Sequence, residues 1–207
     1  MFVKVCGLDT VETARVAVEA GADAVGVVMN RTSPRRLTEE AASEIVAAVK
    51  GFAEGAVETV LVVNDMPAED AALTGNRLGV DVVQLHGTYT LDDFRVALGL
   101  FNGRVWRATS LSTDPDLTVG AYGETRLLLD APLPGSGERW DVSALDGRTP
   151  EGEWLLAGGL NPDNVAAIIA AAQPWGVDVS SGVESAPGVK DHAKVRAFVA
   201  AAKSADE

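Results

Sequence analysis

FVKVCGLDTVETARVAVEAGADAVGVV, residues 2–28, is the segment that indicates the fold class most clearly. It opens with a β-branched run at 2–5, continues with an alanine-rich amphipathic segment at 10–20 and closes with a second β-branched run at 24–28. Short apolar runs are typical of buried strands, whereas apolar residues spaced three and four apart are typical of helices. Gly21 stands between the helix and the second strand, where a glycine commonly ends a helix. The stretch predicts a β-α-β unit.

The same rhythm continues to the end of the sequence. The candidate strands lie at 2–5, 24–28, 58–63, 82–85, 104–107, 126–129, 154–156 and 178–180. The candidate helices lie at 10–20, 38–50, 67–78, 91–100, 161–172 and 191–202, with short pieces near Asp116 and Val142. Eight β-α units in 207 residues favour an α/β fold of the (β/α)8 or TIM-barrel type, with a parallel eight-stranded core. An open doubly wound sheet stays possible, because periodicity does not reveal closure. No linker is visible, so we expect residues 1–207 to form a single domain.

The composition excludes several classes of protein. Thirty acidic residues against 17 basic ones give a net charge of −13, which repels phosphate backbones, so we expect no nucleic-acid partner. The single cysteine cannot close an intramolecular disulfide and no apolar leader opens the sequence, so we expect a cytoplasmic location. The longest uncharged stretch, 165–177, is shorter than the roughly 18–20 apolar residues of a membrane span, so we expect no membrane partner.

Polar residues and glycines gather directly after the candidate strands, which in a barrel is the active face. They are Cys6 and Gly7, residues 33–36, Asn64 and Asp65, His86 and Gly87, Arg107, Asp130, Gly158 and Gly159, and residues 180–182. The last two groups predict a phosphate site, because backbone N–H groups and a helix N-terminus after the seventh and eighth strands point at the anion.

The sequence lacks the residues that several common reaction types require. The sequence has no His-x-x-x-His, no cysteine pair and no dense carboxylate cluster, so we expect no metal. A Schiff-base aldolase needs a lysine at a strand end, and Lys4 lies inside its strand. The glycine-rich dinucleotide fingerprint is missing after the first strand, which disfavours a nicotinamide cofactor.

Six motifs occur together and in a fixed order. They are VKVCGL at 3–8, SPR at 33–35, VQLHG at 83–87, LLLD at 127–130, AGGLNP at 157–162, and DVSSGVES at 178–185 followed by PGVKD at 187–191. Together they resemble the phosphoribosylanthranilate isomerases of tryptophan biosynthesis over the whole chain. The resemblance implies a (β/α)8 barrel and an Amadori rearrangement of N-(5′-phosphoribosyl)anthranilate to 1-(2-carboxyphenylamino)-1-deoxyribulose 5-phosphate. It implies no cofactor.

The resemblance also implies roles for single residues. Cys6 corresponds to the general base, Asp130 to the general acid and Arg35 to the arginine that binds the anthranilate carboxylate. The phosphate contacts correspond to Gly158, Gly159, Ser181 and Gly182, and to Gly135 and Gly137 in the loop after the sixth strand. This loop departs from the family pattern, with WDV at 140–142 where the family often has FDW. Arg36 replaces a common aromatic residue, which leaves Arg35 and Arg36 both open for the carboxylate, and we prefer Arg35.

Lys4 and Cys6 point to the same face of an extended strand, with the lysine one layer below the thiol. A buried ammonium there favours the thiolate, which is scarce at neutral pH because the pKa of free cysteine is about 8.5. A buried charge needs a partner, and Asp178 across the barrel closure is the predicted one.

Two other functions fit part of the sequence. The related barrel isomerase of histidine biosynthesis, or a dual-substrate version, performs the same rearrangement on a larger bisphosphorylated substrate but places aspartate where this chain has Cys6. A non-catalytic phosphosugar-binding barrel needs the glycine loops but neither Cys6 nor Asp130. Arg107, Gln84 and Asn64 can be structural or ligand-binding, and both a monomer and a homodimer are open.

Overall fold

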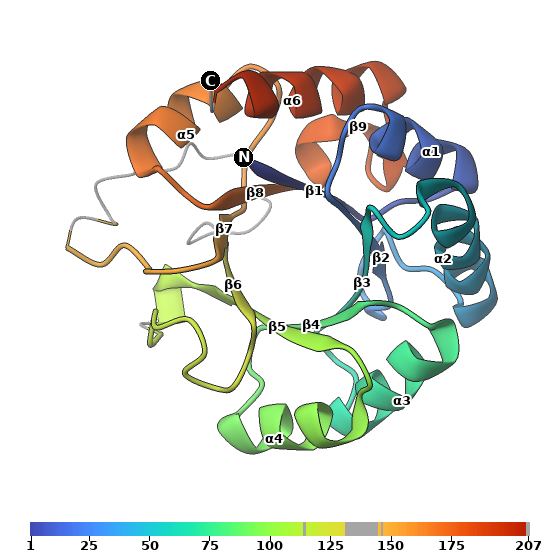
Figure 1. Ribbon diagram of the computed structural model, residues 1–207, viewed down its shortest axis with the longest axis vertical. Coiled ribbons are helices and arrows are strands. Elements are labelled where there is room, and N and C mark those ends of the chain that lie inside the picture. Colours follow the sequence, from blue (N-terminus) through green and yellow to red (C-terminus); the bar gives the residue numbers. More distant parts are fainter. Residues whose placement is uncertain (114, 131–144, 146, 206–207) are drawn as a thin grey trace.

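The computed structural model describes residues 1–113, 115–130, 145 and 147–205. Eight parallel strands form a closed ring in chain order, and the first strand pairs with the eighth (Figure 1). The strands are β1 (Phe2–Cys6), β2 (Ala24–Val28), β3 (Glu58–Val63), β4 (Val82–His86), β5 (Arg104–Ser110), β6 (Arg126–Asp130), β7 (Trp154–Leu156) and β8 (Gly176–Val179). The predicted barrel is therefore confirmed, and the open sheet is wrong.

The α-helices of the described residues lie outside the ring of strands (Figure 1). They are α1 (Val11–Glu19), α2 (Glu39–Ala53), α3 (Ala68–Leu78), α4 (Leu91–Leu100), α5 (Val165–Ala172) and α6 (His192–Ser204). Threonine side chains cap three of them, because Thr10, Thr38 and Thr90 each accept a hydrogen bond from the backbone N–H three residues later. Each bond satisfies a donor that the first helical turn leaves unpaired. No described helix is long and apolar enough to cross a membrane.

Helix α5 begins at Val165, four residues later than predicted. The side chains of Asn161 and Asn164 hold the preceding residues in a turn instead. Asn164 Oδ1 accepts the Asn161 N–H at 2.8 Å, and Asn161 Oδ1 accepts the Asp163 N–H at 2.9 Å. Asparagine favours such local bonds over helical ones, so the helix starts only after the turn.

The helical piece predicted near Asp116 is wrong. The Asp116 carboxylate accepts the N–H of Thr118 at 2.9 Å, which fixes a local turn, and the short 3-10 helix in this region is η1 (Leu111–Thr113). The piece predicted near Val142 lies outside the described residues. β8 starts two residues earlier than predicted because Gly176 is already paired with Phe2 and Leu155 of the neighbouring strands.

The chain after β8 forms two elements that the sequence pattern did not predict. A short 3-10 helix, η3 (Ser181–Val183), leads into an antiparallel hairpin of β9 (Glu184–Ala186) and β10 (Val189–Lys190). Strands of two and three residues are too short to show an alternation of apolar and polar positions. This hairpin lies next to the cavity described below.

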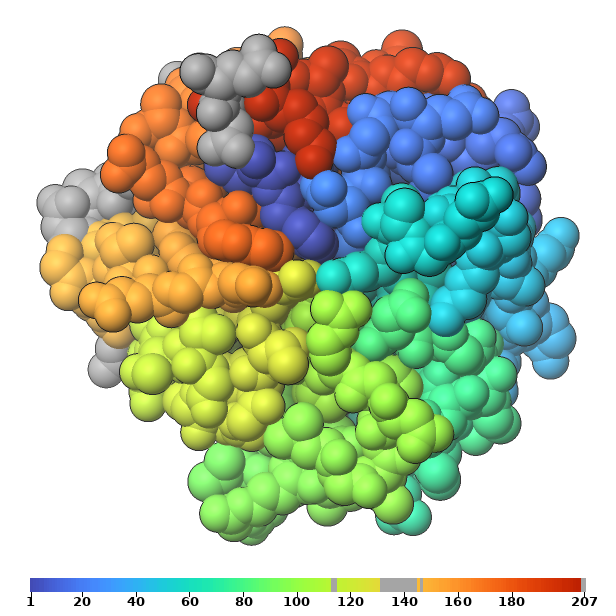
Figure 2. All heavy atoms as spheres, viewed as in Figure 1, coloured from blue at the N-terminus to red at the C-terminus, as the bar shows by residue number. Residues whose placement is uncertain are grey.

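The core has two apolar layers. The larger cluster lies between the outer face of the barrel and the helices, and the smaller one fills the inside of the ring. The inner cluster consists of Cys6, Ala24, Val28, Val60, Val62, Val82, Trp106, Ala108, Leu128, Leu155 and Ala157. Atoms cover the middle of the ring in the space-filling view (Figure 2), as expected for a barrel whose interior is packed.

Arg126 closes the amino-terminal end of the barrel. Its guanidinium carbon lies 4.6 Å from the ring centre of Phe2, 4.9 Å from that of Trp106 and 4.6 Å from that of Trp175. Its Nη1 also binds Glu58 at 2.8 Å. Cations over aromatic rings are attracted by the ring quadrupole, so this cluster stabilises the amino-terminal end of the barrel.

Candidate active site

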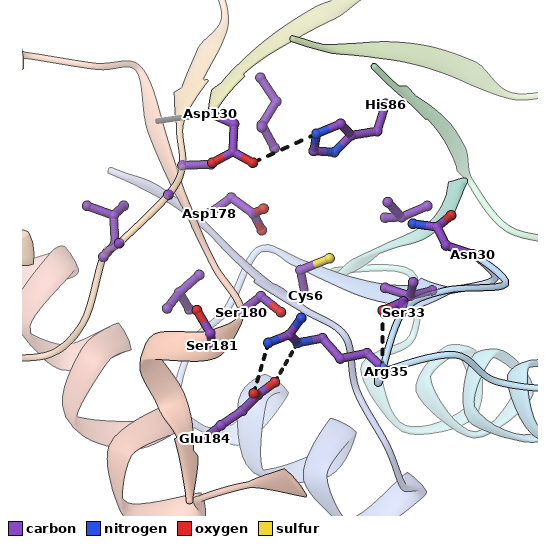
Figure 3. Close-up of a pocket in the computed structure, with 18 of the residues that line it drawn as sticks. Cys6, Asn30, Ser33, Arg35, His86, Asp130, Asp178, Ser180, Ser181 and Glu184 are labelled. Atoms are coloured by element: carbon purple, nitrogen blue, oxygen red, sulfur yellow. Dashed lines mark hydrogen bonds and ion pairs between the residues drawn. The ribbon is translucent and has the colours of Figure 1, made fainter. Parts of the chain in front are cut away.

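A cavity of about 610 Å³ opens at the carboxyl ends of the strands. Its volume is within the range of about 300–1,000 Å³ that small-molecule sites occupy. The polar residues that line it are Cys6, Asn30, Ser33, Arg35, His86, Asp130, Asp178, Ser180, Ser181 and Glu184, which Figure 3 labels, and also Gln84 and Ser185. The cavity is therefore at the face where the sequence predicted the functional residues.

Cys6 and Asp130 come from opposite sides of the barrel and line the same cavity. Cys6 ends β1 and is 6% exposed, whereas Asp130 ends β6. Asp130 Oδ2 lies 3.8 Å from Nε2 of His86, the last residue of β4. Burial and the nearby Lys4 ammonium lower the pKa of His86 below its usual value, so the imidazole is neutral at pH 7. The contact between His86 and Asp130 is therefore no ion pair at neutral pH.

Lys4 is fully buried one layer below Cys6, and its Nζ donates to Asp178 Oδ1 at 2.9 Å. Lys4 and Asp178 are register partners on β1 and β8, so the predicted pair across the barrel closure is confirmed. Burial lowers the pKa of Lys4, but the charges of Asp178 and Cys6 raise it by more, which keeps the ammonium charged. Burial raises the pKa of the Cys6 thiol above its usual value, although Lys4 acts in the opposite direction. Lys4 therefore favours the thiolate as predicted, but burial outweighs it.

Lys4→Met is expected to raise the pKa of the Cys6 thiol further, because the nearest positive charge is lost. The variant is also expected to lose about 3–5 kcal/mol of unfolding free energy, since Asp178 keeps no partner for its buried charge. The thiol can be titrated by thiolate absorbance, and the single cysteine makes the signal unambiguous. Lys4→Met with Asp178→Leu, which removes both charges, is the stability control. An unchanged thiol titration in a folded variant would contradict the role of Lys4.

Arg35 lies in the loop after β2 and reaches over Gly7 towards the cavity. A Cβ on Gly7 would stand 2.6 Å from Arg35 Cδ, so glycine is needed there for the close approach. Arg35 Nε and Nη2 donate to the two carboxylate oxygens of Glu184, at 2.6 and 2.9 Å. Arg36 is exposed and does not line the cavity. Of the two arginines left open by the sequence, only Arg35 contributes to the cavity.

The glycine-rich loops after β7 and β8 meet at one side of the cavity. Gly158, Gly159 and Ser181 line it, and Asn164 Nδ2 fixes the first loop by donating to the Gly159 carbonyl at 2.9 Å. Among the described residues, the backbone N–H groups of Gly159, Ser181 and Gly182 donate to no other protein group. Unpaired N–H groups at such loops are typical of anion sites.

Gly182 does not line the cavity itself. It holds the two loops together, because a Cβ at this position would overlap the carbonyl oxygen of Leu160. A larger residue at 182 would push the loop after β8 away from the loop after β7. Gly135 and Gly137, the remaining predicted phosphate contacts, lie outside the described residues.

Arg107 and Asn64, whose roles the sequence left open, lie outside the cavity. Arg107 points away from the cavity and forms a buried ion pair with Glu124 at 2.7 Å, which identifies it as structural. Asn64 is exposed and does not line the cavity, whereas Gln84 does. The described residues contain no group of three His, Cys, Asp or Glu side chains that could hold a metal ion.

Sequence reasoning missed several residues of the site. Glu184 and Lys190 belong to the quoted motifs, but the sequence predicted no role for either. In the structure Glu184 binds Arg35, and Lys190 binds the loop after β8. Asn30 was also missed, whereas Gln84 had been left open as structural or ligand-binding. Both line the cavity, and among the described residues their buried side-chain oxygens have no hydrogen-bond partner. Arg35 and Glu184 are 149 positions apart in the sequence, so no spacing rule could have paired them.

Comparisons with known proteins agree with this geometry. The family described as "N-(5'phosphoribosyl)anthranilate (PRA) isomerase" matches residues 3–201. The N-(5′-phosphoribosyl)anthranilate isomerase of a Geobacter species is 44% identical over 211 residues, which cover 97% of each protein. The crystal structure of TrpF from Jonesia denitrificans is 55% identical with a TM-score of 0.92, and covers 100% of this chain and 98% of that one.

A further solved structure adds a ligand. It is a phosphoribosyl anthranilate isomerase in complex with reduced 1-(o-carboxyphenylamino)-1-deoxyribulose 5-phosphate, with a TM-score of 0.84, 32% identity and coverage of 99% of each chain. The resemblance that the six motifs predicted is confirmed along the whole chain. The chain belongs to the N-(5′-phosphoribosyl)anthranilate isomerase family.

Proposed function

We propose that this isomerase of tryptophan biosynthesis rearranges N-(5′-phosphoribosyl)anthranilate with Cys6 as general base and Asp130 as general acid. One observation carries the assignment of roles: the thiol and the carboxyl line a single cavity that also contains the guanidinium of Arg35 and loops whose N–H groups have no partner among the described residues. The substrate carries a carboxylate at one end and a phosphate at the other. The cavity offers a matching group for each.

The reaction starts at the sugar ring. The Asp130 carboxyl donates a proton to the ring oxygen, the bond from C1′ to this oxygen breaks, and the nitrogen lone pair forms an iminium at C1′. The Cys6 thiolate then removes the proton on C2′, and the electron pair moves into the C1′–C2′ bond while the iminium is neutralised. The enolamine that results tautomerises to the ketone. Because the iminium takes up the electrons, this chemistry requires no metal or organic cofactor.

Substrate positioning follows from the same residues. Arg35 binds the anthranilate carboxylate, and Gly158, Gly159, Ser181 and Gly182 bind the phosphate through their loops. A relative holds a reduced form of the carboxyphenylamino-deoxyribulose phosphate, which supports a small phosphorylated ligand for this cavity. Gly135 and Gly137 stay assigned to the phosphate by the resemblance alone. Holding both ends of the substrate supplies much of the rate, since it fixes C2′ against the base.

Two wider proposals accompany the mechanism. Residues 1–207 form one catalytic domain, because the strand ring uses both ends of the sequence and pairs β1 with β8. A cytoplasmic location fits a base that must stay a free thiol, since reducing compartments keep cysteine reduced.

The assignment of Arg35 predicts a sharp contrast with its neighbour. Arg35→Met is expected to raise KM by about 100-fold, because a charge-assisted bond to the substrate is lost. Arg36→Met, which removes the same charge one residue away, is expected to change KM by less than about twofold. Steady-state kinetics of the two purified variants provides the test. Equal effects would contradict the choice of Arg35.

The function itself is tested by adding freshly generated N-(5′-phosphoribosyl)anthranilate to purified protein and following the loss of its fluorescence. Rapid decay, abolished by Cys6→Ala with product binding retained, is the expected result. No decay with the anthranilate substrate but turnover of the histidine-pathway substrate would point to the related isomerase. Binding of phosphosugars without any turnover would point to a non-catalytic barrel.

A further inference from the structure

The carboxylate of Glu184 is fully occupied by four hydrogen bonds. Oε1 accepts from Arg35 Nε at 2.6 Å and from Lys190 Nζ at 2.8 Å. Oε2 accepts from Arg35 Nη2 at 2.9 Å and from the Gly188 N–H at 3.2 Å. Burial raises the pKa of Glu184, but the bonds from Arg35 and Lys190 lower it by more, so the group is ionised at neutral pH. Glu184 is thus a fixed anion at the edge of the cavity.

The buried Lys190 ammonium also holds the Glu184 carboxylate in place. Its side chain is 0% exposed, and its Nζ donates to the Ser180 carbonyl at 2.9 Å and contacts Ser180 Oγ at 3.3 Å in addition to Glu184. Lys190 and Glu184 are also register partners in the β9–β10 hairpin. One buried ammonium therefore ties the loop after β8 to the carboxylate that holds Arg35.

The hairpin also contacts the loop that carries Arg35. A Cβ on Gly188 would stand 2.6 Å from the Pro34 carbonyl oxygen, so the turn of the hairpin is pressed against this loop. Arg35 is thereby held at its backbone by the hairpin turn and at its guanidinium by Glu184. A long, flexible side chain is restricted to one arrangement before any ligand arrives.

This arrangement leaves only part of the guanidinium free. Arginine has five N–H donors in a planar fork, and two edges of the fork can bind a carboxylate with two bonds. Glu184 occupies the side edge, formed by Nε and Nη2. No described residue bonds to the end edge, formed by Nη1 and the second N–H of Nη2, and in Figure 3 the third nitrogen points away from Glu184.

We propose that Glu184, held by Lys190, is a positioning residue that blocks the side edge of Arg35 and so leaves the substrate carboxylate only the end edge. The docking angle of the anthranilate ring is then fixed relative to Cys6. This inference rests on the proposed role of Arg35 in binding the carboxylate. The rival interpretation is that Glu184 competes with the substrate for Arg35.

The direction in which Glu184→Gln changes KM distinguishes the two interpretations. Glu184→Gln removes a negative charge beside the site of an anionic substrate, so electrostatics alone and the competitor interpretation both predict a lower KM. Positioning predicts the opposite, because the freed guanidinium adopts several arrangements and must be ordered on binding. We expect Glu184→Gln to raise KM by about tenfold and to lower kcat by less than about threefold.

The experiment compares Glu184→Gln with Glu153→Gln, which alters a similar arginine–glutamate pair (Arg126 to Glu153, 2.6 Å) at the other end of the barrel. Inhibition by anthranilate and by ribose 5-phosphate is measured as well. A raised inhibition constant for anthranilate with an unchanged one for ribose 5-phosphate, and no effect of Glu153→Gln, supports positioning. A lowered KM, or equal weakening of both inhibitors, overturns it. If Glu184→Gln does not fold, Glu184→Asp keeps the charge, shortens the reach, and carries the same prediction for KM.

A double-variant cycle separates this inference from the proposed function. If Glu184 acts through Arg35, Glu184→Gln has no further effect on KM in an Arg35→Met background. A further effect of full size overturns the inference. If Arg35→Met alone leaves KM unchanged, the proposed carboxylate site itself is wrong, whatever Glu184→Gln does.

Discussion

Cys6→Ser lowers kcat/KM for N-(5′-phosphoribosyl)anthranilate by about 1,000-fold, if the thiol is the base that removes the C2′ proton. General base catalysis contributes about 100- to 10,000-fold to the rate. A serine hydroxyl is ionised far less than a thiol at neutral pH, so it supplies almost no base. The substitution keeps the shape of the side chain, which is buried beside β2. Loss of substrate fluorescence gives the rate. A variant that keeps a tenth of the activity or more would contradict the assignment.

The pH dependence follows from the raised pKa of Cys6, which burial causes. Only the thiolate removes a proton, and a raised pKa leaves less thiolate at any pH below it. Alkylation of Cys6 by iodoacetamide needs only the thiolate, so its rate is expected to climb about tenfold per pH unit through the neutral range. The kcat/KM also depends on a protonated general acid, whose loss with rising pH acts in the opposite direction. An alkylation rate that is already flat at neutral pH would show that the pKa of Cys6 is not raised.

Binding provides the control for both measurements. Reduced product, the ligand of a solved relative, needs the carboxylate and phosphate contacts but no base. Cys6→Ser is expected to bind this ligand within about twofold of the natural protein, since neither contact involves the thiol. Weak binding together with low activity would instead indicate a damaged cavity.

The positions of Cys6 and Asp130, the proposed base and acid, could be predicted because strand ends are visible in a sequence. Each short apolar run fixed one strand, and Cys6 and Asp130 follow two such runs directly. Parallel strands bring all their carboxyl ends to one face, so a strand count was enough to place both residues there. Lys4 and Asp178 followed from the same alternation, and their 2.9 Å contact confirms it.

The partners of Arg35 could not be predicted in the same way. Glu184 lies on a three-residue strand, and its contact with Arg35 depends on how the hairpin packs against the loop after β2. Neither periodicity nor local spacing encodes such a contact. The sequence also could not predict that burial raises the pKa of the Cys6 thiol, because the burial of one side chain depends on all eight strands at once.

Asp130→Asn is expected to lower kcat by about 100- to 10,000-fold, because asparagine has the same shape but its amide protons are far too weakly acidic to be transferred to the ring oxygen. Asp65→Asn, which removes a carboxylate after β3 and outside the cavity, is expected to leave kcat unchanged within about twofold. The two rates are measured with the same fluorescence assay. This contrast tests whether the location of Asp130 matters, beyond the loss of one charge.

The step that fails distinguishes the acid from the base. Ring opening must precede removal of the C2′ proton, so a variant without the acid is limited by ring opening. Substrate with deuterium at C2′ should therefore react with Asp130→Asn at nearly the same rate as ordinary substrate. With Cys6→Ser, removal of the C2′ proton limits the rate, and deuterium should slow it strongly. Equal isotope effects in the two variants would contradict the separate roles, because one group would then govern both steps.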